Sequence, residues 1–171
     1  NGQFCSLAFD PAGAPAISYF DAQNSLLKYA RRGTAGWSTE FVDLHQHSGN
    51  DTSLAFDQAG RPAISHVYDG AAYEVRVARW DGAAWATQTV DTSATGLACT
   101  SLAVDPTGAP QLTYIVDKSD VRHARWNGAT WDVETAAPGG RIAGGASIAL
   151  DGAGRPHLAY CDAARAWLRY A

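Results

Sequence analysis

A stretch of thirteen residues recurs in four similar copies along this chain, and this repetition constrains the fold more than any other feature of the sequence. The copies begin at Ser6, Ser53, Ser101 and Ser147, at spacings of 47, 48 and 46 residues. All four follow the pattern S-[LI]-A-x-D-x-x-G-x-P. A fixed period of about 40–50 residues indicates an array of identical supersecondary units.

Each unit divides into four short segments separated by turn residues. The first segment alternates large and small side chains, as Leu7, Ala8 and Phe9 do, and this period of two predicts a strand. The Asp-x-x-Gly-x-Pro that follows predicts a turn, because Asp bonds the backbone ahead of it and Gly permits positive φ. Asp81-Gly82 and Asn127-Gly128 predict hairpins between the third and fourth segments.

Four strands in a meander make the blade of a β-propeller, so the sequence predicts an all-β fold in one domain over residues 1–171. The predicted blades span residues 6–52, 53–100, 101–146 and 147–171. The last blade ends at the counterpart of Ala30 and therefore lacks its fourth strand, which leaves fifteen strands in all.

Three arrangements of these blades remain open at this point. The four blades close into a small ring, two chains combine into one eight-bladed ring, or the chain is part of a longer propeller. A half-ring alone exposes two apolar faces. We therefore favour a homo-oligomer, specifically a dimer that closes an eight-bladed ring.

Composition excludes several classes of function. The net charge is -4 and no run of Lys or Arg occurs, which argues against a nucleic-acid surface or an anionic-membrane surface. No apolar run approaches the roughly 20 residues of a membrane span. The chain begins with Asn rather than Met, so we expect a processed form or a piece of a longer protein.

The repeat continues as x-[IL]-x-[YH], then [LV]-[KR]-x-A and W-x-x-[EQ]-x-V-D, and this consensus resembles a repeat of secreted bacterial multi-blade propeller proteins. The resemblance extends from Ser6 to Ala171. It implies an extracellular protein with an architecture like that of lectins and adhesins, and it carries no catalytic motif. Typical copies have His after the turn proline, whereas here only His157 does, against Ala16, Ala63 and Gln111.

Residues that recur in every blade are interpreted first as structural. A basic residue opens the third segment and an Asp closes the second, and we expect ion pairs or strand-capping bonds between the two series. These series are Lys28, Arg76, Arg122 and Arg169, and Asp21, Asp69, Asp117 and Asp162. The tryptophans that open the fourth segment suit packing, although an indole at an open rim can stack on a sugar ring. They are Trp37, Trp85 and Trp131.

The loops at the other end of each blade vary between repeats, and variable loops on a rigid scaffold usually carry binding residues. His45 and His47, with Asp43 or Asp51, have the side chains of a transition-metal site, but two imidazoles in a flexible loop seldom suffice. We therefore predict no metal and no cofactor. The candidate ligand-binding residues are Asn24, His45, His47, Asp51, Tyr73 and Asp117.

Two of the three cysteines lie on the first and last blades. Cys5 opens the first blade and Cys161 ends the second segment of the last. Because these blades become neighbours when a ring closes, we hypothesise a Cys5–Cys161 disulfide, within one chain or between two.

Three functions follow in order of preference. The first is a non-catalytic extracellular binding or adhesion module that takes a glycan or a protein ligand. The second is a structural or assembly module of a larger secreted protein. The third is a hydrolase, which is least favoured because no G-x-S-x-G, phosphate loop or H-E-x-x-H is present, although acids from different blades can meet in a propeller.

Overall fold

The computed structural model describes residues 2–93 and 95–171, with only the backbone of Ala143. The described chain forms fifteen strands. The first sheet comprises β1 (Gly2–Phe9), β2 (Pro15–Asp21), β3 (Leu26–Gly33) and β4 (Gly36–Asp43). The second comprises β5 (Ser48–Phe56), β6 (Pro62–Asp69), β7 (Tyr73–Trp80) and β8 (Trp85–Ser93). The third comprises β9 (Leu97–Val104), β10 (Pro110–Val116), β11 (Asp120–Trp126) and β12 (Trp131–Ala137), and the fourth β13 (Ile142–Leu150), β14 (Pro156–Asp162) and β15 (Trp167–Tyr170).

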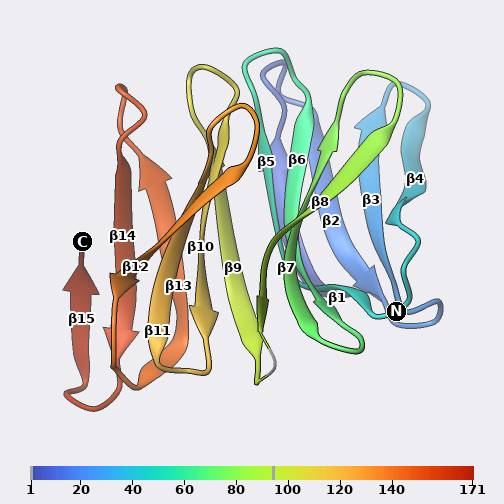
Figure 1. The fold of residues 1–171 in the computed structure, drawn as a ribbon. Coiled ribbons are helices and arrows are strands. Elements are labelled where there is room, and N and C mark those ends of the chain that lie inside the picture. The colour runs from blue at the N-terminus through green and yellow to red at the C-terminus, as the bar shows by residue number, and fades with distance from the viewer. Residues whose placement is uncertain (1, 94) are drawn as a thin grey trace.

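Each sheet is an antiparallel meander whose strand order follows the sequence. The first three sheets have four strands and the fourth has three (Figure 1). This is the blade pattern of a β-propeller, and it confirms the predicted fold class and strand count. The described part of the chain contains no helix long and apolar enough to cross a membrane.

The first strand of each sheet, here called the inner strand, begins four or five residues before the serine that opens its repeat. These strands begin at Gly2, Ser48, Leu97 and Ile142. Each of these strands has an irregular register near its start. In three of them a residue other than glycine adopts positive φ there: Phe4 at 50°, Asp51 at 49° and Cys99 at 57°. A bulge of this kind lengthens the strand while turning it, so the linker between repeats pairs with its own sheet.

The repeated aspartates form the turns that the sequence predicts. In each copy one carboxylate oxygen accepts from two backbone amides, as Asp105 does from Thr107 at 2.8 Å and Ala109 at 3.0 Å. The other copies repeat this pattern at Asp10, Asp57 and Asp151.

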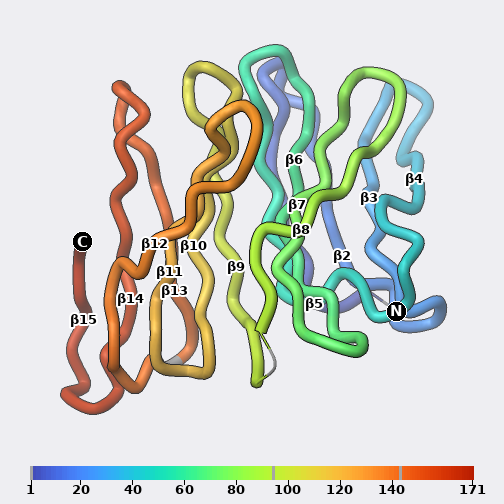
Figure 2. The backbone as a smooth tube through the Cα atoms, in the orientation of Figure 1, coloured from blue at the N-terminus to red at the C-terminus, as the bar shows by residue number. Residues whose placement is uncertain are grey.

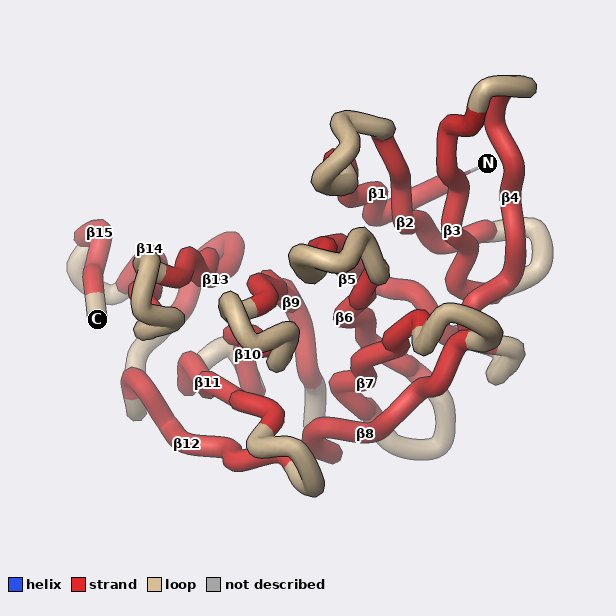
Figure 3. The backbone as a smooth tube through the Cα atoms, turned by 90° about the horizontal axis from the view of Figure 1, so that it is seen from above, coloured by secondary structure: helices blue, strands red, loops and turns tan. Residues whose placement is uncertain are grey.

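The four sheets stand side by side in an arc, with inner strand packed on inner strand from β1 through β5 and β9 to β13. Figure 3 shows this arc from above, with the first and last sheets on either side of an open centre. Figure 2 shows the two ends of the chain far apart, at opposite ends of the arc. The core lies between sheets: Leu54 of the second sheet, for example, packs in one cluster with Leu27 of the first.

The predicted ion pairs are correct in two sheets and wrong in two. Lys28 bonds Asp21 at 3.0 Å and Arg169 approaches Asp162 to 3.6 Å, within their own sheets. The middle sheets differ, because their arginines reach an aspartate that ends the outer strand of the preceding sheet. These contacts are Arg76–Asp43 at 3.1 Å and Arg122–Asp91 at 2.5 Å, with Arg76 also 2.8 Å from Glu74. Residue 137, the counterpart of Asp91 in the third sheet, is Ala, so Arg169 has no such acid to reach.

Candidate functional site

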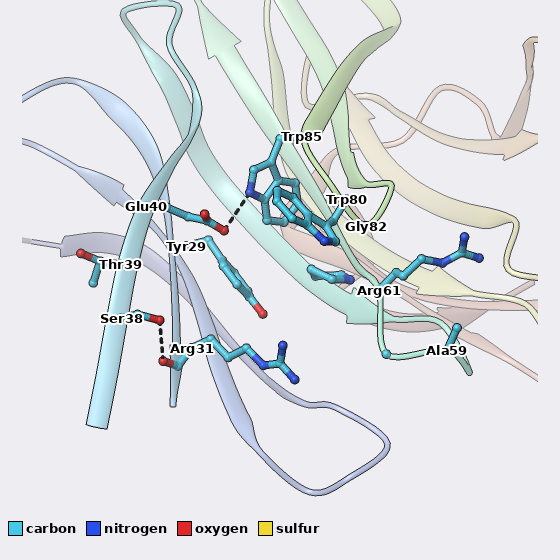
Figure 4. Close-up of a pocket in the computed structure, with 12 residues that line it drawn as sticks. Tyr29, Arg31, Ser38, Thr39, Glu40, Ala59, Arg61, Trp80, Gly82 and Trp85 are labelled. Carbon is cyan, nitrogen blue, oxygen red and sulfur yellow. Dashed lines mark hydrogen bonds between the residues drawn. The ribbon is translucent and has the colours of Figure 1, made fainter. Parts of the chain in front are cut away.

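The most complete constellation of aromatic and polar side chains lies between the first two sheets, at the end of the blades where β1 joins β2 and β3 joins β4. This hollow, here called the first groove, has a volume of about 360 Å³. Its functional side chains come from β3, β4, the β5–β6 turn and the β7–β8 hairpin (Figure 4). They are Tyr29, Arg31, Glu40, Arg61, Trp80 and Trp85.

One wall of the first groove is aromatic. The rings of Trp80 and Trp85 meet edge to face with centroids 5.6 Å apart, and Trp85 meets Tyr29 of the preceding sheet in the same way at 5.3 Å. The hairpin places both indoles together because they flank its turn, in which Asp81 accepts from the amides of Ala83 and Ala84. Partly exposed indoles fixed in this way offer an apolar surface beside polar groups.

The polar side of the groove is already engaged in hydrogen bonds. Trp85 Nε1 donates to Glu40 Oε1 at 3.0 Å, which fixes the carboxylate against the aromatic wall (Figure 4). Arg31 Nη2 donates to Asp10 Oδ2 at 2.6 Å, and Arg61 Nε donates to Asp57 Oδ2 at 2.7 Å. The amide of Ala14 and the Arg31 guanidinium lower the pKa of Asp10, so the pair stays charged. Each arginine of the groove is therefore balanced by an aspartate.

Tyr29 supplies a buried hydroxyl at the groove. Its Oη has no hydrogen-bond partner among the described residues. Burial raises the pKa of Tyr29 to about 12, so the group is protonated at neutral pH. A buried hydroxyl without a partner costs free energy, but this oxygen is closed to a molecule that sits in the groove.

The corresponding groove between the second and third sheets, the second groove, lacks much of this chemistry. Val77 replaces Tyr29, Gln88 replaces Glu40 and Ala109 replaces Arg61. Arg79, the counterpart of Arg31, lies over the ring of Trp126 at 4.5 Å and donates to Gln88 Oε1 at 3.0 Å. The second groove is still a hollow, of about 340 Å³, but no carboxylate is among the residues that line it beside Arg79 and Trp126.

The third groove, between the third and fourth sheets, has counterparts of the charged residues of the first groove but not of its aromatic wall. Arg125, Glu134 and Arg155 stand at the positions of Arg31, Glu40 and Arg61. Glu134 bonds the imidazole of His123 at 3.0 Å. The fourth sheet has no fourth strand among the described residues, so no counterpart of Trp85 faces them.

The residues predicted to bind a ligand lie at the opposite end of the blades and in separate places. Asn24 Nδ2 donates to Asp21 at 2.7 Å, and His45 Nδ1 lies 2.6 Å from Asp43 Oδ1, so both side chains hold their own loops. His47 is exposed. The described residues contain no group of three or more His, Cys, Asp or Glu arranged to hold a metal ion.

The other three predicted residues line two further hollows. Tyr73 and Asp117 share one of about 410 Å³ between the second and third sheets. Asp51 lines another of about 320 Å³ where the four inner strands converge, and its carboxylate accepts from the amide of Cys99 at 3.1 Å. These residues stay candidates, but the structure does not gather them into one site.

The hypothesis of a disulfide within one chain is wrong. All three cysteines are free thiols, and Cys5 and Cys161 lie on the first and last sheets, on either side of the open centre of the arc (Figure 3). The version between two chains stays a prediction.

The first groove was not predicted, because binding residues were expected in the loops that vary between repeats. The turns around the groove have nearly constant length, and only single positions in them change, as at Ala14, Arg61 and Ala109. The recurring tryptophans were the available signal, since Trp85 is one of the indoles expected either to pack or to stack on a sugar.

No family model matches the chain, and no curated protein matches its sequence. Solved structures match its fold. A fucose lectin from Kordia zhangzhouensis in complex with methyl-fucoside aligns with a TM-score of 0.54 and 14% identity, over 78% of this chain and 99% of that one. The Aleuria aurantia lectin in complex with Fucα1-6GlcNAc aligns with a TM-score of 0.62 and 13% sequence identity, over 91% of this chain and 53% of that one.

A Hadza microbial sialidase also matches, at a TM-score of 0.61 and 13% identity, over 95% of this chain and 42% of that one. The chain thus spans about half of the Aleuria lectin and less than half of the sialidase. At these identities the likeness establishes the β-propeller fold, which both lectins and a sialidase have.

Proposed function

We propose that this protein is a non-catalytic carbohydrate-binding propeller module and that the first groove holds one neutral sugar residue. The observation that carries the proposal is the pairing of the Trp80 and Trp85 indoles with the Glu40 carboxylate in one open hollow. A sugar ring has an apolar face that packs on an indole and hydroxyls at its edge that bond to charged groups. The lectins with this fold that are solved with fucosides make a fucoside a sensible first probe.

Charge favours a neutral sugar over an acidic one. Arg31 and Arg61 are each bonded to an aspartate, and Glu40 adds a further negative charge. A sugar carboxylate is best recognised by a guanidinium that has no carboxylate partner of its own. An acidic sugar would have to compete with Asp10 or Asp57 for these arginines.

The same groups support binding rather than hydrolysis. Glycoside hydrolysis typically uses two carboxyl groups on either side of the scissile bond. Among the residues lining the first groove Glu40 is the one carboxylate, and it is bonded to an indole. We place the activity outside the cell, in adhesion or glycan capture, because the repeat resembles one of secreted proteins.

A glycan array that presents neutral and sialylated structures tests this proposal. We expect binding to neutral glycans. Glu40→Ala and Trp85→Ala should each weaken it by about 10-fold or more, since each removes a bond to a charged group or a stacking surface. The matched control is Gln88→Ala, which changes the same position in the second groove and should leave binding intact.

Two outcomes would contradict the proposal. One is an array without neutral-glycan binding by a folded chain, and the other is binding that neither Glu40→Ala nor Trp85→Ala weakens. Retention of the circular dichroism spectrum shows that each variant folds. Hydrolysis of a glycoside lost in Glu40→Ala would favour the hydrolase instead.

Assembly is a second candidate function, and it is compatible with the first. Large apolar side chains are exposed on the two sheets that end the arc, notably Leu7, Phe9 and Leu168. Exposed apolar side chains on the face of a sheet are a common feature of interaction sites.

A further inference from the structure

Three hollows follow one another along the rim of the first three sheets, at the end of the blades that carries the first groove. Between the first and second grooves lies a hollow of about 200 Å³, here called the bridging hollow. It shares Arg61, Pro62 and Trp80 with the first groove. It shares Arg79 and Gly108 with the second groove. Because neighbouring hollows have walls in common, the three adjoin in a row.

Small side chains leave the bridging hollow open. Ala86 of β8 and Val104 of β9 both line it. Val104 is the smallest residue at its position in the four repeats, where the other copies have Phe9, Phe56 and Leu150. A larger side chain in place of Val104 would take up part of this volume.

Arg79 places hydrogen-bond donors on the bridging hollow. Its guanidinium lies over the ring of Trp126, 4.5 Å from the centroid, and this contact holds it in place. Arg31 and Arg61 are each paired with an aspartate, whereas Arg79 has no carboxylate within ion-pair distance among the described residues. A guanidinium without a carboxylate partner keeps donors for the hydroxyls of a ligand.

Charge in the bridging hollow is balanced. Asp57 and Asp81 line it together with Arg61 and Arg79. Two carboxylates beside two guanidinium groups give no excess positive charge for an acidic group to meet. The bridging hollow therefore suits a second neutral sugar residue, whose hydroxyls both donate and accept hydrogen bonds.

Indoles accompany the hollows along the rim. Trp80 lines both the first groove and the bridging hollow, so it stands where one passes into the other. Beyond the bridging hollow, Trp126 and Trp131 meet edge to face at 5.5 Å, as Trp80 and Trp85 do at 5.6 Å. Successive sugar residues can pack their apolar faces on rings arranged in this way.

We propose that the ligand is a neutral oligosaccharide of at least two residues laid along this rim, with one residue in the first groove and the next in the bridging hollow beside Arg79. This inference rests on the carbohydrate-binding function and names its ligand class. The second groove has no carboxylate among the residues that line it, so it extends the surface and is not a separate site for a single sugar.

Titration calorimetry with sugars of two lengths tests the proposal. The first probe is the methyl glycoside of the neutral sugar that binds best on the array. The others are disaccharides in which that sugar is joined, through each linkage, to glucose, galactose or N-acetylglucosamine. At least one disaccharide should bind about 10-fold more tightly than the methyl glycoside, because it adds a hydrogen bond to a charged group.

Two variants locate this gain in the bridging hollow. Arg79→Ala removes the donors, and Val104→Phe fills the hollow with the residue that the first two repeats have at this position. Each should remove most of the gain and leave the affinity for the methyl glycoside unchanged, because neither residue lines the first groove. Arg155→Ala, which removes an exposed guanidinium from the fourth sheet, is the matched control and should keep the gain.

Disaccharides that all bind no more tightly than the methyl glycoside would overturn the proposal. A gain that both variants retain would overturn it too, as would an equal loss of methyl glycoside affinity in both. Circular dichroism verifies that each variant folds. The first two results leave a single sugar in the first groove intact, because Glu40→Ala and Trp85→Ala test that site with the methyl glycoside alone. A folded chain that binds no sugar would overturn both proposals.

Discussion

At the scale of single residues, the four repeats share a backbone and differ in chemistry at a few positions. Glu40, Gln88 and Glu134 occupy one position, and their partners differ: Trp85, Arg79 and His123 respectively. The exchange of Glu40 for Gln88 is one of the changes that leave the second groove without a carboxylate among the residues that line it. Functional specificity in this chain resides in such exchanges, because residues common to all repeats hold the blades together.

His66 gives a residue-scale prediction about pH. It is completely buried, its Nε2 lies 3.6 Å from Asp43 Oδ2, and Arg76 and Glu74 complete its charged surroundings. Burial lowers the pKa of His66 from 6.5 to about 4. Between these pH values His66 is therefore protonated in the unfolded chain and neutral in the folded chain. Stability is therefore full above pH 6.5 and falls as the pH drops toward 4, by about 2–3 kcal/mol.

Urea unfolding at pH 7 and pH 5 measures this loss. His66→Gln should remove most of the difference, whereas His47→Gln, which changes an exposed histidine, should preserve it. An equal loss in His66→Gln and the parent chain would show that other groups cause the acid sensitivity.

At the scale of elements, hydrogen bonds between inner strands join one sheet to the next. The amide of Leu102 donates to Ser53 Oγ across such a junction. Ser53→Ala should therefore lower the free energy of unfolding by about 1 kcal/mol, whatever the protein concentration. Urea unfolding measures this loss, and Ser147→Ala, which changes the same repeat position in the fourth sheet, is the matched control.

Ser147→Ala should change the free energy of unfolding little, because the structure gives Ser147 no such bond among the described residues. Equal losses of stability in the two variants would contradict the role of the hydrogen bond between sheets.

Much of this element-scale structure could be predicted from the sequence. The alternation around Leu7 and the Asp-x-x-Gly-x-Pro turns are local signals, and they yielded the strands, the meander and the roles of the four turn aspartates. The pairing of Arg76 with Asp43 could not be predicted, because it depends on which sheets become neighbours in space. The first groove shares this difficulty, since Tyr29 and Trp85 belong to different blades, and its turns also lack the variation that directed the search to the other end of the blades.

At the scale of the whole molecule, the chain is an arc with three junctions between sheets and one complete groove. The second groove, of about 340 Å³, has no carboxylate among its lining residues, and the third has no indole facing Arg125 among the described residues. The described chain should therefore bind one sugar.

The stoichiometry of sugar binding tests this account most directly. Isothermal titration with the methyl glycoside of the neutral sugar that binds best on the array should give one site per chain. Glu40→Ala should reduce the heat of binding, and Gln88→Ala should not change it. Two or three equivalent sites per chain, or one site that survives Glu40→Ala unchanged, would contradict the assignment of binding to the first groove.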